Sequence, residues 1–189
     1  MAIRSKFRKA LQIVKSNKNL IYISFFILLL SAVYGYFFSG QFPTLEKEFL
    51  EFLKSISLDK NPFELTLFII YNNIKSSLFI LLLGIIAGII PPIILFTNGY
   101  IIGSVLHTTI QETSPLILLA LVPHGIFEIP AVCISAGLGI RLGLVWFKKN
   151  RKKNFKRVIK ESILVFIYIV IPLLIIAGII EGTLIWLGG

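Results

Sequence analysis

Charged residues are scarce in this sequence: they make up 15% of its 189 residues, against about 25% in an ordinary soluble domain. Hydrophobic residues account for 56% of the chain, and the mean hydropathy is +0.89. The polar stretches, residues 1–19, 39–64 and 148–162, are each too short to bury a hydrophobic core of their own. This composition excludes a soluble enzyme, a soluble nucleic-acid-binding protein and a membrane-tethered globular domain.

Cysteine and acidic residues are also few. The single cysteine, Cys133, excludes an intrachain disulfide. Nine acidic residues stand against nineteen basic ones, a formal net charge of +10, and fourteen of the basic residues lie in two blocks, residues 4–18 and 148–160. Basic clusters that flank apolar spans set membrane topology and contact anionic lipid headgroups. We therefore expect membrane lipids, and not nucleic acid, to be the partners of these blocks.

Long apolar runs are abundant, and they predict an all-α polytopic membrane helix bundle in which residues 1–189 form a single membrane domain. A run of about 20 apolar residues crosses the ~30 Å hydrocarbon core. Pro91 and Pro92 divide the second span from the third, because proline ends a helix behind it and fits well in a first turn. The fourth run is too long for one straight crossing, so we expect a break near Pro123 and Gly125. The five predicted spans cover approximately residues 20–38, 65–90, 91–110, 115–147 and 162–187.

The predicted topology follows from the two basic blocks. Four spans separate them, so both blocks lie on one side of the membrane, and the positive-inside rule makes that side cytoplasmic. The sequence therefore predicts a multi-pass protein of the cell membrane with a cytoplasmic N-terminus and an external C-terminus. Residues 39–64 form an external loop with five acidic and three basic residues, a net charge of −2. Within it, an amphipathic helix over residues 44–58 either lies along the outer membrane surface or covers the mouths of the spans.

Pairs of glycines four residues apart occur in four of the predicted spans. Glycine at this spacing leaves a flat stripe on which helix backbones approach closely. The stripes serve either ordinary packing inside one bundle or association with a second copy. The four pairs are Gly84/Gly88, Gly99/Gly103, Gly139/Gly143 and Gly178/Gly182.

Several polar residues interrupt the apolar runs. A charge at the bilayer centre costs roughly 2.5–3.5 kcal/mol on insertion scales, so these side chains are expected to face one another or a wet cavity. On the predicted topology, three spans bring such groups to the outer leaflet. The predicted intramembrane polar cluster consists of His124, Glu128, Glu181, Asn72, Asn73 and Asn98.

His124 and Glu128 are four residues apart and therefore share one helical face. With Glu181 they form a structural hydrogen-bond network, a proton or cation site, or a catalytic metal site. The H-x-x-x-E spacing differs from the H-E-x-x-H of zinc proteases, so we predict no metal, no cofactor and no catalytic residue, and these three residues are only weak metal candidates. Arg141 lies about two turns from the cytoplasmic end of its span, and we expect it to extend toward the headgroups.

Several segments of the chain resemble one known family. These are NGYIIG at residues 98–103, PHGIFEIPA at 123–131, the glycine-rich stretch 137–143, and Glu181 in the last span. Asn72, Asn73 and the Gly84/Gly88 pair fit its second span. The sequence resembles the stage II sporulation protein M family over roughly residues 72–182. The resemblance implies a five-span integral membrane protein without recognised enzymatic activity, whose bacterial namesake anchors two peptidoglycan-degrading partners at the membrane during spore engulfment.

Three functional hypotheses follow from these features. The first is a non-enzymatic membrane scaffold or assembly protein, which engages a second copy of itself or other proteins of the membrane and cell envelope. The second is a transporter or channel with a proton or cation site at His124, Glu128 and Glu181, since broken helices beside buried ionisable groups are typical of transporters. The third is an intramembrane metal-dependent hydrolase, which would need further nitrogen or sulfur ligands that the apolar runs do not supply.

Overall fold

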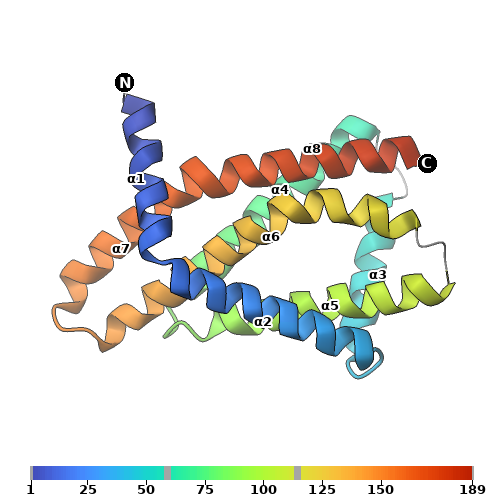
Figure 1. Ribbon diagram of the computed structural model, residues 1–189, viewed down its shortest axis with the longest axis horizontal. Helices are drawn as coiled ribbons and strands as arrows, with labels where there is room; N and C mark the ends of the chain where they lie inside the picture. Colours follow the sequence, from blue (N-terminus) through green and yellow to red (C-terminus); the bar gives the residue numbers. More distant parts are fainter. Residues whose placement is uncertain (1, 58–60, 113–115, 189) are drawn as a thin grey trace.

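The computed structural model of the chain describes residues 2–57, 61–112 and 116–188; within these ranges, the side chains of residues 2, 50, 52–57, 109, 111–112, 116–124 and 185–188 are outside the description. The described residues form helices joined by turns, and no strand occurs among them. The elements are α1 (Ala2–Ser16), α2 (Lys18–Phe37), α3 (Pro43–Ser57), α4 (Pro62–Leu83), α5 (Ile90–Glu112), α6 (Leu116–Gly143), the 3₁₀ turn η1 (Leu144–Phe147), α7 (Arg151–Val165), the π turn η2 (Phe166–Val170) and α8 (Ile171–Gly188) (Figure 1).

Among the described residues, five helical segments are long and apolar enough to cross a membrane, which confirms the predicted all-α membrane bundle. They are Lys18–Phe37, Pro62–Leu83, Ile90–Thr108, Gly125–Phe147 and Arg151–Leu184.

The bundle has two parts. The first is the pair α2 and α5, which pack most extensively on each other, and the second is the trio α4, α6 and α8. α6 joins the parts, because it also packs on α2 and α5. In the apolar part of α6 that is long enough to cross a membrane, 61% of the residues are buried, compared with 22% in the corresponding part of α2. α6 is therefore the central helix, and α2 keeps most of its surface for lipid.

Two helices run across the long spans at opposite ends of the bundle (Figure 1). α1 crosses near the start of α2 and packs on α7 and η2, and α3 crosses at the other end and packs on α5. The two basic segments, α1 and the start of α7, lie at one end, whereas the C-terminus lies at the other. The segment predicted as an amphipathic helix over 44–58 is α3, although residue 58 lies outside the described residues.

The boundary between the second and third spans differs from the prediction. α4 ends at Leu83 instead of continuing to residue 90, and a turn over residues 84–89 precedes α5. Ala87 and Gly88 adopt positive φ angles of 50° and 73°, a conformation that a helix does not contain and that glycine tolerates best. Pro91 then falls in the first turn of α5, where its missing N–H is harmless. The turn that contains these positive φ angles thus separates α4 from α5 before the prolines are reached.

The break predicted near Pro123 and Gly125 is wrong. α6 is a continuous helix from Leu116 to Gly143, and it bends along its length in Figure 1. A proline inside a helix removes one backbone hydrogen bond and kinks the helix, and in a spanning helix the surroundings satisfy the carbonyl that is released. The extra length of this run is used by a long, bent helix.

The last span begins earlier than predicted. α7 starts at Arg151 and continues through η2 into α8, so one bent helix carries both the basic segment and the apolar span. The π turn over Phe166–Val170 ends two residues before Pro172. Proline lacks an N–H donor and its ring displaces the carbonyl of the preceding turn, and a locally widened turn relieves both problems.

Candidate functional sites in the membrane bundle

Glu128 of α6 and Glu181 of α8 lie within electrostatic range of each other. α6 and α8 pack directly against each other, both side chains are half-buried, and they are close enough to interact electrostatically. Gly182, the neighbour of Glu181, lies against Thr66 of α4. This part of the predicted cluster is therefore formed by the trio of helices, where two acidic groups of like charge would compete for one proton or share one cation.

The other members of the predicted cluster are distributed differently. The side chain of His124 lies outside the described residues, although its backbone belongs to α6. Asn72 and Asn73 are half-buried on α4, which packs on both α6 and α8. Asn98 is half-buried on α5, next to Gly99, and α5 packs mainly on α2. Among the described residues, no group of three potential metal ligands occurs.

A hydrogen-bonded site that the sequence analysis did not identify surrounds Tyr100 of α5. Tyr100 is fully buried, and its hydroxyl donates to Glu46 Oε1 of α3 at 2.7 Å. The backbone N–H of Phe42 donates to the same hydroxyl at 3.2 Å, and the Phe42 and Tyr100 rings meet edge to face at 5.0 Å between centroids. Glu46 also accepts the N–H of Gly40 at 2.9 Å. Together these contacts attach the start of α3 to the bundle.

A sequence signal for this site does exist. Tyr100 stands in an apolar run between Gly99 and Gly103, and a buried tyrosine hydroxyl requires a partner. Its partner could not be chosen from the sequence, because Glu46 is 54 residues away and one of several acidic residues in the loop.

Arg141 does not extend to the headgroups as predicted. Its Nη2 forms an ion pair with Glu161 Oε2 of α7 at 2.5 Å, and the two side chains are only 17% and 24% exposed. Glu161 is not an expected partner on sequence grounds, because it lies in a segment predicted to be a polar connector. Since α7 extends the last span backward, it carries Glu161 alongside α6, where Glu161 pairs with Nη2 of the arginine. The buried Nη1 has no hydrogen-bond partner among the described residues.

The paired glycines lie at close contacts within the chain. A Cβ added at Gly99 or Gly103 would collide with α2, one at Gly178 or Gly182 with α4, and one at Gly139 with the backbone of Ile80 in α4. Gly84 lies against Gly139, and Gly143 against Gly88. Gly84 and Gly88 are in the turn after α4, so this pair is not the helical stripe that its spacing predicts. These contacts account for all four pairs without a second copy.

Comparisons with known proteins identify the family of the chain. Residues 24–184 match the family described as stage II sporulation protein M. An uncharacterized protein of Methanocaldococcus jannaschii is similar to the chain, with 34% identity over 189 residues that cover 92% of this chain and 86% of that protein. No solved structure matches. The match spans all five candidate membrane helices almost completely, and the chain therefore belongs to the stage II sporulation protein M family.

Proposed function

We propose that this protein is a non-enzymatic membrane scaffold, and that the surface it offers to a partner is the exposed side of α3. The observation that carries this proposal is the attachment of α3 by Tyr100. The hydroxyl of a fully buried tyrosine in a spanning helix is hydrogen-bonded to Glu46 and to the backbone of Phe42. A spanning helix thereby holds a segment that lies across the ends of the spans.

An α3 that is already ordered lowers the entropic cost of binding a partner. Fixing the backbone of a free loop costs about 1–2 kcal/mol per residue, and a partner that binds a loose segment has to supply that free energy. When the bundle has already ordered the start of α3, binding does not include this cost. The side of α3 that faces away from the bundle is charged and exposed: Lys47 and Glu51 form an i,i+4 pair at 3.9 Å with side chains 78% and 65% exposed, and Glu48 lies beside them.

Photo-crosslinking in native membranes tests the proposal. A photoreactive amino acid in place of Glu48 should give a discrete crosslinked species, and the same group in place of Leu30 on the exposed, apolar side of α2 should not. Tyr100→Phe should lower the yield at position 48, because it releases α3. Tyr34→Phe, the same change on a partly exposed neighbouring ring, should leave the yield unchanged.

The mass of the crosslinked species distinguishes a second copy of the chain from another membrane or cell-envelope protein. A label that reacts only with lipid at position 48, or a yield that is the same in the Tyr100→Phe and Tyr34→Phe variants, would refute the assignment of α3 as the docking surface.

A second candidate function rests on the two interacting carboxylates. We infer that Glu128 and Glu181 would form the proton or cation site if the protein were a transporter, since intramembrane acidic pairs take up protons or cations. Flux of protons or monovalent cations into proteoliposomes should then fall strongly in Glu128→Gln. Glu48→Gln, which removes a carboxylate from the exposed side of α3, is the matched control. Equal flux through the unmodified protein, Glu128→Gln and empty liposomes would dismiss this function.

A further inference from the structure

The apolar side of α1 is only partly covered by the rest of the protein. Ala10 and Ile13 are buried and belong to the same core as Val165 and Phe166. Ile3, Phe7 and Leu11 follow one another at intervals of four and are 74%, 43% and 38% exposed. Residues at this interval form a stripe along one side of a helix. α1 is therefore fixed to the bundle by one set of apolar residues and presents a second set outward.

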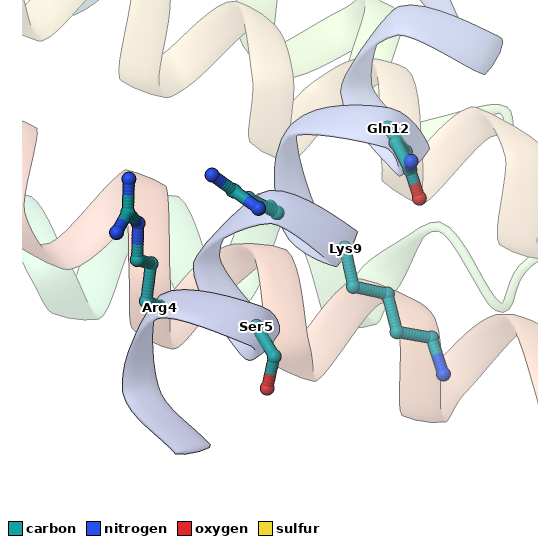
Figure 2. A pocket seen from close by; sticks show the side chains of 5 residues that line it. Arg4, Ser5, Lys9 and Gln12 are labelled. Carbon is teal, nitrogen blue, oxygen red and sulfur yellow. The ribbon is translucent and has the colours of Figure 1, made fainter. Parts of the chain in front are cut away.

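The remaining surface of α1 is basic. Arg4, Lys6, Arg8, Lys9 and Lys15 are all exposed, and α1 contains no acidic residue. Each helical position is rotated by about 100° from the one before, so Arg4 and Arg8, which directly follow Ile3 and Phe7, lie beside the apolar stripe. Lys9 lies on nearly the opposite side of the helix. Figure 2 shows Arg4 and Lys9 leaving α1 in opposite directions.

The orientation of α1 matches a membrane surface. α1 runs across the spanning helices in Figure 1, and α2, the first span, begins at Lys18, two residues after α1 ends. The contacts of α1 with α7 and η2 hold it in this direction. A helix across the end of a bundle of spans lies parallel to the bilayer plane, at the depth where the polar headgroups begin.

The polar side of α1 carries a shallow hollow lined by Arg4, Ser5, Arg8, Lys9 and Gln12 (Figure 2). All five residues come from one helix, so the hollow has no wall from a second element. Sites for small soluble ligands are enclosed and bury most of the ligand. The hollow is therefore not itself a ligand site, and Lys9 and Gln12 line the part of it that lies away from the apolar stripe.

We propose that α1 is an interfacial helix that binds anionic phospholipids: Ile3, Phe7 and Leu11 enter the acyl region, and Arg4 and Arg8 bind the headgroup phosphates. The charge of the helix selects anionic over zwitterionic lipid, and the apolar stripe selects a bilayer over a soluble phosphate. Basic residues at a membrane surface each contribute a similar electrostatic attraction to anionic lipid, so the two arginines next to the stripe should act additively.

The first part of the test locates the stripe. The native Cys133 is buried, and in a Cys133→Ala background a single cysteine at Phe7 or at Gln12 carries an environment-sensitive NBD fluorophore. The full-length protein is reconstituted in vesicles that contain phosphatidylcholine and phosphatidylglycerol. The fluorophore at position 7 should emit as in an apolar medium and be quenched by doxyl-labelled lipid, and the fluorophore at position 12 should emit as in water.

The second part tests lipid selection. The ratio of quenching by doxyl-phosphatidylglycerol to quenching by doxyl-phosphatidylcholine at position 7 measures the enrichment of anionic lipid. Arg4→Gln and Arg8→Gln should each lower the enrichment by about fivefold, and Lys9→Gln should change it by less than about twofold. The melting temperature of each variant shows that the bundle remains folded.

Three outcomes would overturn the proposal. Water-like emission at position 7 in vesicles that contain phosphatidylglycerol would show that the stripe does not enter the bilayer. An enrichment ratio near one, or an equal loss in Arg4→Gln and Lys9→Gln, would show that the arginines beside the stripe do not select anionic lipid. An NBD signal in pure phosphatidylcholine vesicles that changes with inorganic phosphate, and that Arg4→Gln abolishes, would identify a soluble anion as the ligand instead.

Discussion

Replacing Tyr100 with phenylalanine is the sharpest test of how the bundle holds α3. The change removes one oxygen atom from a fully buried ring and leaves its packing against Phe42 in place. That oxygen is hydrogen-bonded to the Glu46 carboxylate at 2.7 Å and by the Phe42 N–H at 3.2 Å, and the Phe38 carbonyl is a second acceptor within reach at 3.3 Å. The variant therefore isolates the polar part of the attachment.

The free energy that the attachment of α3 should lose in this variant follows from the type of each hydrogen bond. A hydrogen bond to a charged group contributes about 1.5–3 kcal/mol, and one between neutral groups about 0.5–1.5 kcal/mol. Glu46 is half-buried and keeps the N–H of Gly40, and Phe42 is 40% exposed, so water replaces part of what is lost. We expect Tyr100→Phe to weaken the attachment of α3 by about 1.5–2.5 kcal/mol, which is roughly a 10- to 70-fold change in the opening equilibrium.

Amide hydrogen exchange of the full-length protein in lipid nanodiscs measures this equilibrium. Protection in the first turns of α3, residues 43–49, should fall by that factor, and the protection of α6 should not change. Tyr34→Phe is the matched control, because this tyrosine packs near Tyr100 and its hydroxyl makes no hydrogen bond among the described residues. Equal amide exchange of α3 in the two variants would show that the Tyr100 hydroxyl does not hold the start of α3.

Three further variants test other contacts by the unfolding free energy of the reconstituted protein. Glu161→Ala leaves the Arg141 charge without its ion-pair partner and should destabilise the bundle by about 2–3 kcal/mol, because both side chains are mostly buried. Lys152→Ala, at an exposed position, should have no effect. Similar losses of unfolding free energy in the two variants would argue against a stabilising ion pair between Arg141 and Glu161. Gly103→Ala should destabilise by about 1–3 kcal/mol, because its Cβ would overlap the backbone of Ala32 and Tyr36. At Gly125, the nearest atom to an added Cβ is a side-chain methyl of Ile129 at 3.6 Å. Gly125→Ala should therefore be neutral or stabilise the helix by up to about 1 kcal/mol. A loss of unfolding free energy as large as in Gly103→Ala would exclude steric overlap as the cause of the Gly103→Ala effect.

The class of fold was predictable because it depends on properties that each segment has by itself. A run such as residues 20–38 is long and apolar enough to cross a bilayer whatever the rest of the chain does. The ends of the helices were less predictable, because proline and glycine act according to their surroundings. Pro123 is accommodated inside α6, whereas the positive φ angles at Ala87 and Gly88 end α4 before Pro91 is reached.

The polar contacts were predictable only in part. Glu128 and Glu181 stand out in the sequence because they lie in apolar runs, and the fold brings them within electrostatic range of each other, while the full polar cluster stays a prediction. The partners of Tyr100 and Arg141 were not predictable, because Glu46 and Glu161 stand in segments that look solvent-exposed in the sequence. Such residues become partners only when the fold brings their helices against the spans.

The pairing of α2 with α5 has a consequence for how the protein is made. The first span finds its main partner only after two further helices have been synthesised, so α2 has to remain in the bilayer alone for that time. Its buried face contains Ser24 and Ser31, whose hydroxyls donate to carbonyls of their own helix, those of Leu20, Ile27 and Leu28. Because these hydroxyls are satisfied without a neighbour, the two serines present no unpaired polar group to the acyl chains. The serine hydroxyls on the buried face of α2 thus need no partner helix before α5 is synthesised.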